Sequence, residues 1–179
     1  GGMRYGRNRN FGCHHHKSPV QMIDGIAYSC NAYFGTAYLN TLNKYNTPQE
    51  GITAWQSHLK SFGLGDFMGY DLPIGRPGFI PGESYYNKTH DYPNRRWGSA
   101  ATLSNSIGQG EVALTPMQMA HFTATIANRG WFYRPHIIKK IEGQDSIPSL
   151  YEQKNYTTID ARHFEPIIQG LNDVYNYGT

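Results

Sequence analysis

A hydroxyl, a thiol and a carboxamide occur side by side in the segment Ser29-Cys30-Asn31. Apolar and small residues at 26–28 and 32–34 flank it, and they predict two helices joined at this polar triplet. A hydroxyl can relay a proton, and a carboxamide can donate and accept hydrogen bonds at once. Ser29 and Asn31 could therefore assist acyl transfer at a nucleophile that lies elsewhere. The competing interpretation is an ordinary helix cap, which Ser-x-Asn also forms.

Sulfur and imidazole groups form a second candidate site. Cys13 runs directly into His14, His15 and His16, and Cys30 lies further along the chain. Two cysteines are too few for a framework of disulfides. A single bridge between Cys13 and Cys30 and a metal site are therefore the two alternatives.

A serine and a lysine also stand three positions apart, at Ser57 and Lys60. This is the spacing that a serine acyl-enzyme uses on one helical face. Trp55 and Leu59 mark the buried stripe of the same predicted helix, so we expect Ser57 and Lys60 to face solvent. We interpret the spacing as a coincidence.

Helix signals surround these groups. We expect a helix from Ser18, with Ser18 as cap and Pro19 in the first position, to about Tyr28. Others are predicted over 31–42, over 47–62 after the capping box Thr47-Pro48-Gln49-Glu50, over 115–127 after Thr115-Pro116, and after Asp160. Gly63 and Gly130 are expected to end two of them.

The remaining segments predict little regular structure. Residues 64–98 are rich in Gly, Pro and Tyr and are expected to form a turn-rich connection with only short strands, such as 78–80. The best strand is predicted over 131–142, followed by a polar loop over 143–158. Met117, Met119 and Phe122 are expected in the core.

Composition narrows the class of protein. The chain has 179 residues, 39% of them hydrophobic and 14% aromatic, which predicts one folded domain with a core. A net charge of +3 is too small to indicate nucleic-acid binding. The sequence has no membrane-spanning run and no secretory signal. We expect the chain to be a fragment of a longer protein.

Seven short segments, taken in order, resemble the transpeptidase domain of class B penicillin-binding proteins, most closely the cell-elongation branch. They are Ser29-Cys30-Asn31-Ala32-Tyr33-Phe34, Phe62-Gly63-Leu64-Gly65, Asp71-Leu72-Pro73, Ser106-Ile107-Gly108-Gln109-Gly110, Leu114-Thr115-Pro116-Met117-Gln118-Met119-Ala120, Asn128-Arg129-Gly130 and Arg134-Pro135-His136. The resemblance implies an α+β, multi-layer α/β/α fold of the serine β-lactamase type. Residues 1–179 would be its helical part, with an incomplete central antiparallel sheet.

The resemblance also implies an activity, a peptidoglycan D,D-transpeptidase that cross-links stem peptides through a serine acyl-enzyme and binds β-lactams. Ser29 would shuttle a proton between a lysine and the leaving amine, and Asn31 would hold that lysine and the acyl amide. The Ser-x-x-Lys and Lys-Thr/Ser-Gly motifs of the family would lie outside this chain, so we expect the chain alone to be inactive. The alternative within the same fold is a non-catalytic β-lactam sensor or structural partner.

The chemistry implied by the resemblance needs no cofactor, but some elongation-type members carry zinc. The resemblance implies Cys30 and His16 as zinc ligands, with Cys13 and His14 as alternative ligands. Thiolate and imidazole groups suit zinc. A metal-binding structural protein built on residues 13–16 is the third hypothesis. The resemblance further implies a glycosyltransferase partner and a place at the extracytoplasmic face of the cell membrane, with the anchor outside the chain.

Overall fold

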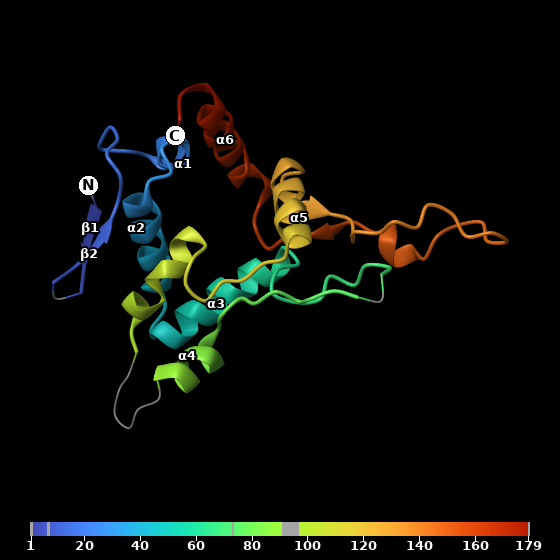
Figure 1. Cartoon of the computed structure of the whole chain (residues 1–179), viewed down its shortest axis with the longest axis horizontal. Coiled ribbons are helices and arrows are strands. Elements are labelled where there is room, and N and C mark those ends of the chain that lie inside the picture. The colour runs from blue at the N-terminus through green and yellow to red at the C-terminus, as the bar shows by residue number, and fades with distance from the viewer. Residues whose placement is uncertain (1, 7, 73, 91–96, 179) are drawn as a thin grey trace. The chain divides into compact units, whose positions relative to one another are not determined.

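The computed structural model describes residues 2–6, 8–72, 74–90 and 97–178. The motif residue Pro73 lies outside these ranges. The chain divides into two compact units, described separately below. The first unit contains residues 1–57, 81–112 and 165–179, and the second contains residues 58–80 and 113–164. Figure 1 labels the larger elements along the chain.

The first unit is mainly helical. Its strands β1 (Gly2–Tyr5) and β2 (Arg9–Gly12) form an antiparallel pair in which Met3 lies opposite Phe11. Its helices are α1 (Met22–Ala27), α2 (Asn31–Leu42), the greater part of α3 (Pro48–Ser61), α4 (Glu83–His90), the 3-10 helix η1 (Ser99–Ile107) and α6 (Glu165–Tyr177).

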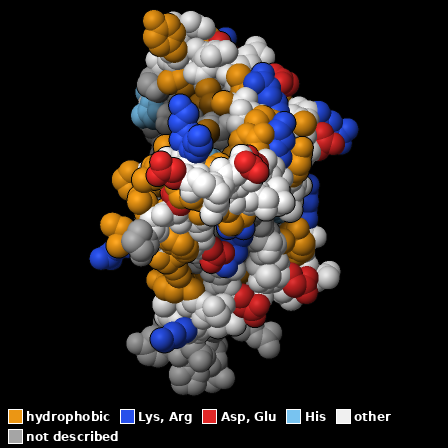
Figure 2. Space-filling model, turned by 90° about the vertical axis from the view of Figure 1, so that its right-hand side faces the viewer, with side chains coloured by type: hydrophobic (Ala, Val, Ile, Leu, Met, Phe, Trp, Pro, Cys, Tyr) orange, Lys and Arg blue, Asp and Glu red, His pale blue; other side chains and the backbone are white. Residues whose placement is uncertain are grey.

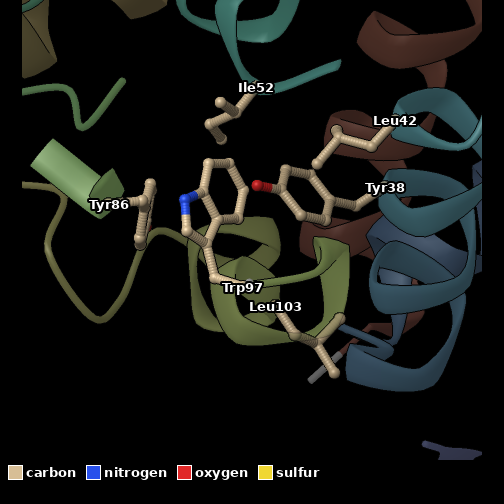
Figure 3. Close-up of a cluster of buried hydrophobic side chains, with 6 residues drawn as sticks. All are labelled: Tyr38, Leu42, Ile52, Tyr86, Trp97 and Leu103. Carbon is tan, nitrogen blue, oxygen red and sulfur yellow. The ribbon is translucent and has the colours of Figure 1, made fainter. Parts of the chain in front are cut away.

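Buried aromatic and aliphatic side chains hold the first unit together. Figure 3 shows Tyr38 and Leu42 projecting from α2 toward Trp97, with Ile52 and Tyr86 beside that ring. A chain of hydrogen bonds runs through this core. The Tyr38 hydroxyl donates to Thr102 Oγ1 at 2.8 Å, Asn105 Nδ2 donates to the Tyr86 hydroxyl at 2.8 Å, and Tyr86 donates to Glu111 Oε2 at 3.0 Å. Buried polar groups need such partners, so this network fixes α2 against η1.

The second unit is built around α5 (Pro116–Ala127). Phe62 stacks at a tilt against Phe122 and Phe164, with ring centroids 5.3 and 6.2 Å apart. Its other elements are the antiparallel pair β3 (Trp131–Phe132) and β4 (Asn155–Tyr156), and the 3-10 helices η2 (Ser149–Tyr151) and η3 (Ala161–His163). Both sheets among the described residues are therefore two-stranded.

Several helix predictions are confirmed. α2 covers the predicted residues, and α3 follows the predicted cap, where Thr47 Oγ1 accepts from the Glu50 N–H at 3.2 Å. The Glu50 carboxylate accepts from the N–H of Asn46, one residue before the cap. Gly63 closes α3 with a φ of +76°, in the left-handed region that a side chain disfavours. Pro166 lies in the first turn of α6, where its missing N–H costs nothing.

Two helix predictions are wrong. α1 begins at Met22 and not after Ser18, because Gln21 still has an extended backbone and its side chain makes no capping hydrogen bond. The turn-rich stretch 64–98 contains α4, which is too short and polar for its periodicity to stand out. Tertiary packing supports this helix, because Tyr86 is completely buried.

The predicted strand over 131–142 is also wrong, since only Trp131–Phe132 pairs. Pro135 has no N–H to donate to a sheet. The N–H groups of Ile137 and Ile138 instead donate to Asp71 Oδ2, at 2.9 and 2.7 Å. A carboxylate therefore takes the bonds that a neighbouring strand would have needed.

The assignment of the methionines of α5 to the core is wrong as well. Met117 and Met119 are 46% and 53% exposed, whereas Gln118 and His121 are buried. The buried face of this helix is polar, and a prediction based on hydrophobic periodicity selects the opposite face.

The surface charges and the hydropathy of the helices agree with the small net charge and the lack of a membrane-spanning run noted from the sequence. Figure 2 shows basic and acidic side chains interspersed among hydrophobic ones on the face that it draws, with no segregation of either sign there. None of the helices in the described ranges is long and apolar enough to cross a membrane.

Candidate functional site

Ser29 occupies the turn that ends α1. The Ser29 N–H donates to Ile26 O at 3.0 Å and the Cys30 N–H donates to Gly25 O at 2.9 Å. These two bonds form a Schellman motif, in which the residue at the position of Ser29 is usually glycine because its backbone is left-handed. Ser29 has a φ of +49° and is exposed. A serine here costs about 1 kcal/mol relative to glycine, and such strain recurs at functional sites.

Asn31 is the first residue of α2 and is half-buried. Its Nδ2 donates to Gly12 O at 3.2 Å, which ties the start of α2 to the end of β2. Ser29 and Asn31 thus flank Cys30 at the joint between α1 and α2. A groove of about 460 Å³ beside this joint is lined by Cys30, Ala32 and Tyr33, while Ser29 and Asn31 are not among its lining residues.

Three of the candidate metal ligands meet in this unit. The Sγ atoms of Cys13 and Cys30 and a ring nitrogen of His16 all lie within 4.8 Å of one another. Cys13 Sγ is 3.2 Å from His16 Nε2 and 3.8 Å from Cys30 Sγ. The predicted pair Cys30 and His16 is therefore brought together, with Cys13 and not His14 as the third member. The spacing Cys13-x-x-His16 could have indicated this choice.

The cysteines are free thiols, so the disulfide considered from the sequence is not formed. His16 Nδ1 lies 2.7 Å from Lys17 O. Because a carbonyl only accepts, Nδ1 carries the proton there, and Nε2 is left as the ligating nitrogen in the neutral ring. That orientation directs Nε2 toward Cys13 Sγ.

The two thiols have different electrostatic surroundings. Burial raises the pKa of Cys13, but hydrogen bonds with the Ala32 backbone and with His16 outweigh it and lower that pKa to about 7. Burial raises the pKa of the Cys30 thiol. The hydrogen bond to Lys17 O, followed by that to Cys13, raises the pKa of His16. Cys30 Sγ also caps α2, accepting from the Tyr33 N–H at 3.3 Å.

Two thiols and one imidazole fit zinc. Thiolate sulfur and imidazole nitrogen are the donors of structural zinc sites, and here their atoms are already close together. Cys13 and Cys30 would supply thiolates and His16 would supply Nε2.

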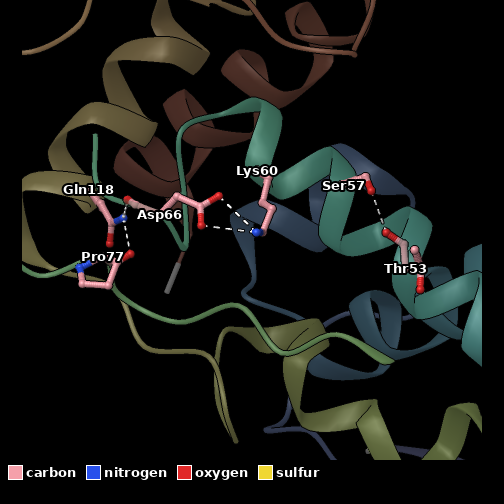
Figure 4. Close-up of polar contacts among 6 residues, drawn as sticks. All are labelled: Thr53, Ser57, Lys60, Asp66, Pro77 and Gln118. Carbon is pink, nitrogen blue, oxygen red and sulfur yellow. Dashed lines mark hydrogen bonds and ion pairs between the residues drawn. The ribbon is translucent and has the colours of Figure 1, made fainter. Parts of the chain in front are cut away.

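The Ser57-x-x-Lys60 spacing has a different environment. Figure 4 shows the Ser57 hydroxyl donating to Thr53 O within α3, at 2.9 Å, and Lys60 Nζ directed to the Asp66 carboxylate, at 3.1 Å. Ser57 and Lys60 are both exposed, as expected. Each polar group is engaged with another residue, and neither bond joins the serine to the lysine.

Gln118 is a structural residue that the sequence interpretation overlooked. Its Nε2 donates to Asp66 O at 3.1 Å and to Pro77 O at 2.8 Å (Figure 4). Its Oε1 accepts from the Thr115 N–H, and Thr115 Oγ1 accepts from the Gln118 N–H, which is a complete capping box. The pattern Thr115-x-x-Gln118 could have revealed it.

Comparison with known proteins places this chain in a family. The family model described as "Penicillin binding protein transpeptidase domain" matches residues 1–179. The peptidoglycan D,D-transpeptidase MrdA of Acinetobacter baumannii is 33% identical over 124 residues, which are 69% of this chain and 17% of that protein. MrdA of Haemophilus influenzae is 30% identical over 138 residues, 74% of this chain and 20% of that protein.

Solved structures of penicillin-binding proteins have a fold similar to that of this chain. The crystal structure of Pseudomonas aeruginosa PBP2 in complex with WCK 5153 has a TM-score of 0.66 at 26% identity, covering 85% of this chain and 30% of that one. The complex of PBP2 and MreC from Helicobacter pylori has a TM-score of 0.69 at 23% identity, covering 98% of this chain and 30% of that one, and shows the fold alone.

The predicted penicillin-binding protein fold is confirmed, in a mostly helical form with small sheets. The chain spans about a fifth of the length of the curated relatives that it matches. Residues 1–179 belong to the penicillin-binding protein transpeptidase family, within the group of class B members that resemble penicillin-binding protein 2 and MrdA.

Proposed function

We propose that this chain is part of a peptidoglycan D,D-transpeptidase that cross-links stem peptides through a serine acyl-enzyme and reacts with β-lactams. The observation that supports it most is the family match over residues 1–179. The geometry at Ser29 adds support, because an exposed hydroxyl occupies a left-handed position where glycine would be more stable.

Ser29 would act as a proton relay. Its hydroxyl would pass a proton between the lysine of a Ser-x-x-Lys motif and the amine that leaves the D-Ala-D-Ala stem. We place that motif and the Lys-Thr/Ser-Gly motif in parts of the longer protein outside residues 1–179. The chain by itself would then lack the nucleophile and would not turn over substrate.

Asn31 would position the reacting groups. Its Nδ2 already donates to Gly12 O, so Oδ1 is the atom that would accept from the lysine ammonium. The bond to Gly12 fixes the carboxamide plane, which reduces the motion lost when substrate binds. An acyl amide of the substrate would lie beside the same carboxamide.

Zinc would have a structural part in this proposal. Cys13, His16 and Cys30 would hold the ion, which supplies a cross-link between residues 13–16 and the first turn of α2. The acyl transfer itself needs no cofactor. We further propose an extracytoplasmic location and a glycosyltransferase partner. A solved structure that is 26% identical to this chain, described as the structural coordination of polymerization and crosslinking by a peptidoglycan synthase complex, supports an assembly of this kind.

Acylation of the longer protein by a labelled penicillin tests the proposal. Ser29→Ala and Asn31→Ala should each slow acylation by about 100-fold, because each removes a group that moves a proton or holds the reacting atoms. Ser57→Ala is the matched control, an exposed helical serine whose loss should leave the rate unchanged.

Acylation at the wild-type rate in Ser29→Ala would refute the role of Ser29. Acylation without release of D-alanine from a stem pentapeptide would favour the β-lactam sensor over the enzyme. The isolated 179-residue chain should remain unlabelled, and a labelled serine within it would contradict the proposed location of the nucleophile.

A further inference from the structure

Cys13 and Cys30 face each other at a distance that suits a second kind of chemistry. Their Sγ atoms are 3.8 Å apart although the residues are 17 positions apart in the chain. A disulfide requires about 2 Å between its sulfurs, so a small movement of one side chain would bring the atoms into bonding distance. Both residues are free thiols here.

The two thiols differ in access. Cys13 is half-buried and lines the groove of about 460 Å³, together with His14, His15 and His16. Cys30 also lines this groove, but it is only 3% exposed and is held at the start of α2, where it caps the helix. A reagent that enters the groove would therefore meet Cys13 first, with Cys30 behind it at resolving distance.

We propose that Cys13 and Cys30 are a site of oxidative modification, at which a disulfide-bearing oxidant converts them to an intramolecular disulfide. The Cys13 sulfur attacks one sulfur of the oxidant and breaks its S–S bond, and His16 takes the proton of the Cys13 thiol and passes it to the thiolate that leaves. The Cys30 sulfur then attacks Cys13 Sγ in the mixed disulfide, and the Cys30 proton goes to the second thiolate as it leaves. Two electrons and two protons have passed from the cysteine pair to the oxidant.

Oxidation and metal binding exclude each other at this site. Both use the same two sulfurs, and a disulfide sulfur is no longer a thiolate ligand. A metal-loaded chain is thus protected from oxidation, and an oxidised chain cannot take up the metal. This inference is independent of the transpeptidase activity, since it needs only the geometry of Cys13, His16 and Cys30.

The test uses the reduced, metal-free 179-residue chain incubated with oxidised glutathione, followed by alkylation and peptide mapping by mass spectrometry. We expect a linked peptide pair containing Cys13 and Cys30, formed at least about tenfold faster than in the same chain unfolded in urea. An equal rate in the folded and unfolded chain, or glutathione that remains on Cys13, would overturn the proposal.

Single variants test the order of attack. Cys30→Ser should retain glutathione on Cys13, and Cys13→Ser should react at least about tenfold more slowly because Cys30 is buried. Circular dichroism establishes whether each variant is folded. If a variant is not folded, the peptide mapping of the wild-type chain described above tests the proposal by itself. If folded Cys13→Ser reacted faster than folded Cys30→Ser, the proposed order, in which Cys13 attacks the oxidant first, would be refuted. Oxidation at an unchanged rate in excess zinc would refute the exclusion.

Discussion

Two helices of this protein begin at capping side chains of opposite character. α5 begins at Thr115, whose hydroxyl and the side chain of Gln118 complete a reciprocal capping box. α2 begins at Cys30, whose sulfur is a weak acceptor and lies 3.3 Å from the Tyr33 N–H. The first cap is suited to stability, whereas the second leaves stability below its optimum and places a reactive group at the helix start.

The turns that precede the two helices show the same contrast. Ser29, the residue before the cap of α2, has a left-handed backbone, whereas Leu114, the residue before the cap of α5, does not have a positive φ. The caps themselves, Cys30 and Thr115, are both extended. We infer that α5 is built for packing and that the start of α2 is built for chemistry. Protein design shows a similar trade between stability and function. The predictions that follow test this contrast, beginning with the largest effect.

Gln118→Ala should lower the free energy of unfolding by about 3 kcal/mol, because it removes a cap and the two hydrogen bonds that the buried Gln118 amide donates to the carbonyls of Asp66 and Pro77. Urea denaturation of the whole chain measures the change. Gln109→Ala, at an exposed position, is the control and should change it by less than about 0.5 kcal/mol. Equal effects would show that α5 does not depend on its buried polar face.

Zinc should stabilise the chain by about 2.7 kcal/mol when its concentration is 100 times its dissociation constant. Cys13→Ser should abolish this gain, because it removes one of the three grouped ligands. Thermal unfolding with zinc and with a chelator measures it. His15→Ala is the matched control for the histidine run. Zinc stabilisation that survives in Cys13→Ser would mean that the ion binds elsewhere.

Thr115→Ala should cost about 1 kcal/mol of stability, the usual value of a lost hydroxyl cap. Cys30→Ser in the absence of zinc should cost less, because a hydroxyl can accept the Tyr33 N–H in place of the sulfur. Urea denaturation compares the two. A larger loss in Cys30→Ser than in Thr115→Ala would contradict our view that the thiol is kept for chemistry.

His121 should make stability depend weakly on pH. Burial lowers its pKa, and its Nε2 has no hydrogen-bond partner among the described residues. A folded pKa below the unfolded one means that the unfolded chain binds more protons. The contribution is therefore fully present above the usual histidine pKa of about 6.5 and is lost as the pH falls from there through the lowered pKa of the folded state.

Urea midpoints measured between about pH 7.5 and 5.5 check this dependence. His121→Leu should flatten it, whereas His58→Leu, at an exposed position, should leave it unchanged. A profile that is identical in the wild type and in His121→Leu would assign the pH dependence to other groups.

Local sequence signals predicted the helix starts correctly where the relevant contacts are local. Thr47 and Glu50 cap α3, and Gly63 ends it, because the donors and acceptors concerned lie within four residues of one another. The polar triplet at 29–31 was likewise placed at a helix joint, since its flanking residues carry the periodicity of α2. The roles of Ser29 and Asn31 in catalysis remain a proposal.

Long-range contacts explain the errors. Asp71 takes the N–H groups of Ile137 and Ile138 from a position more than sixty residues away, so the β-branched run does not form a strand. Tyr86 makes α4 stable by entering a core built from other segments. A prediction from local periodicity contains neither contact.

The order and spacing of short motifs were by themselves enough to predict the family, the starts of α2, α3 and α5, and the candidate groups Ser29, Asn31, Cys30 and His16. Only the tertiary structure selected Cys13 over His14 as the third member of the sulfur and imidazole cluster. It also showed that the buried face of α5 is polar. The physical reason is that a cap is satisfied by neighbours in sequence, whereas a ligand cluster or a buried amide depends on where distant segments meet.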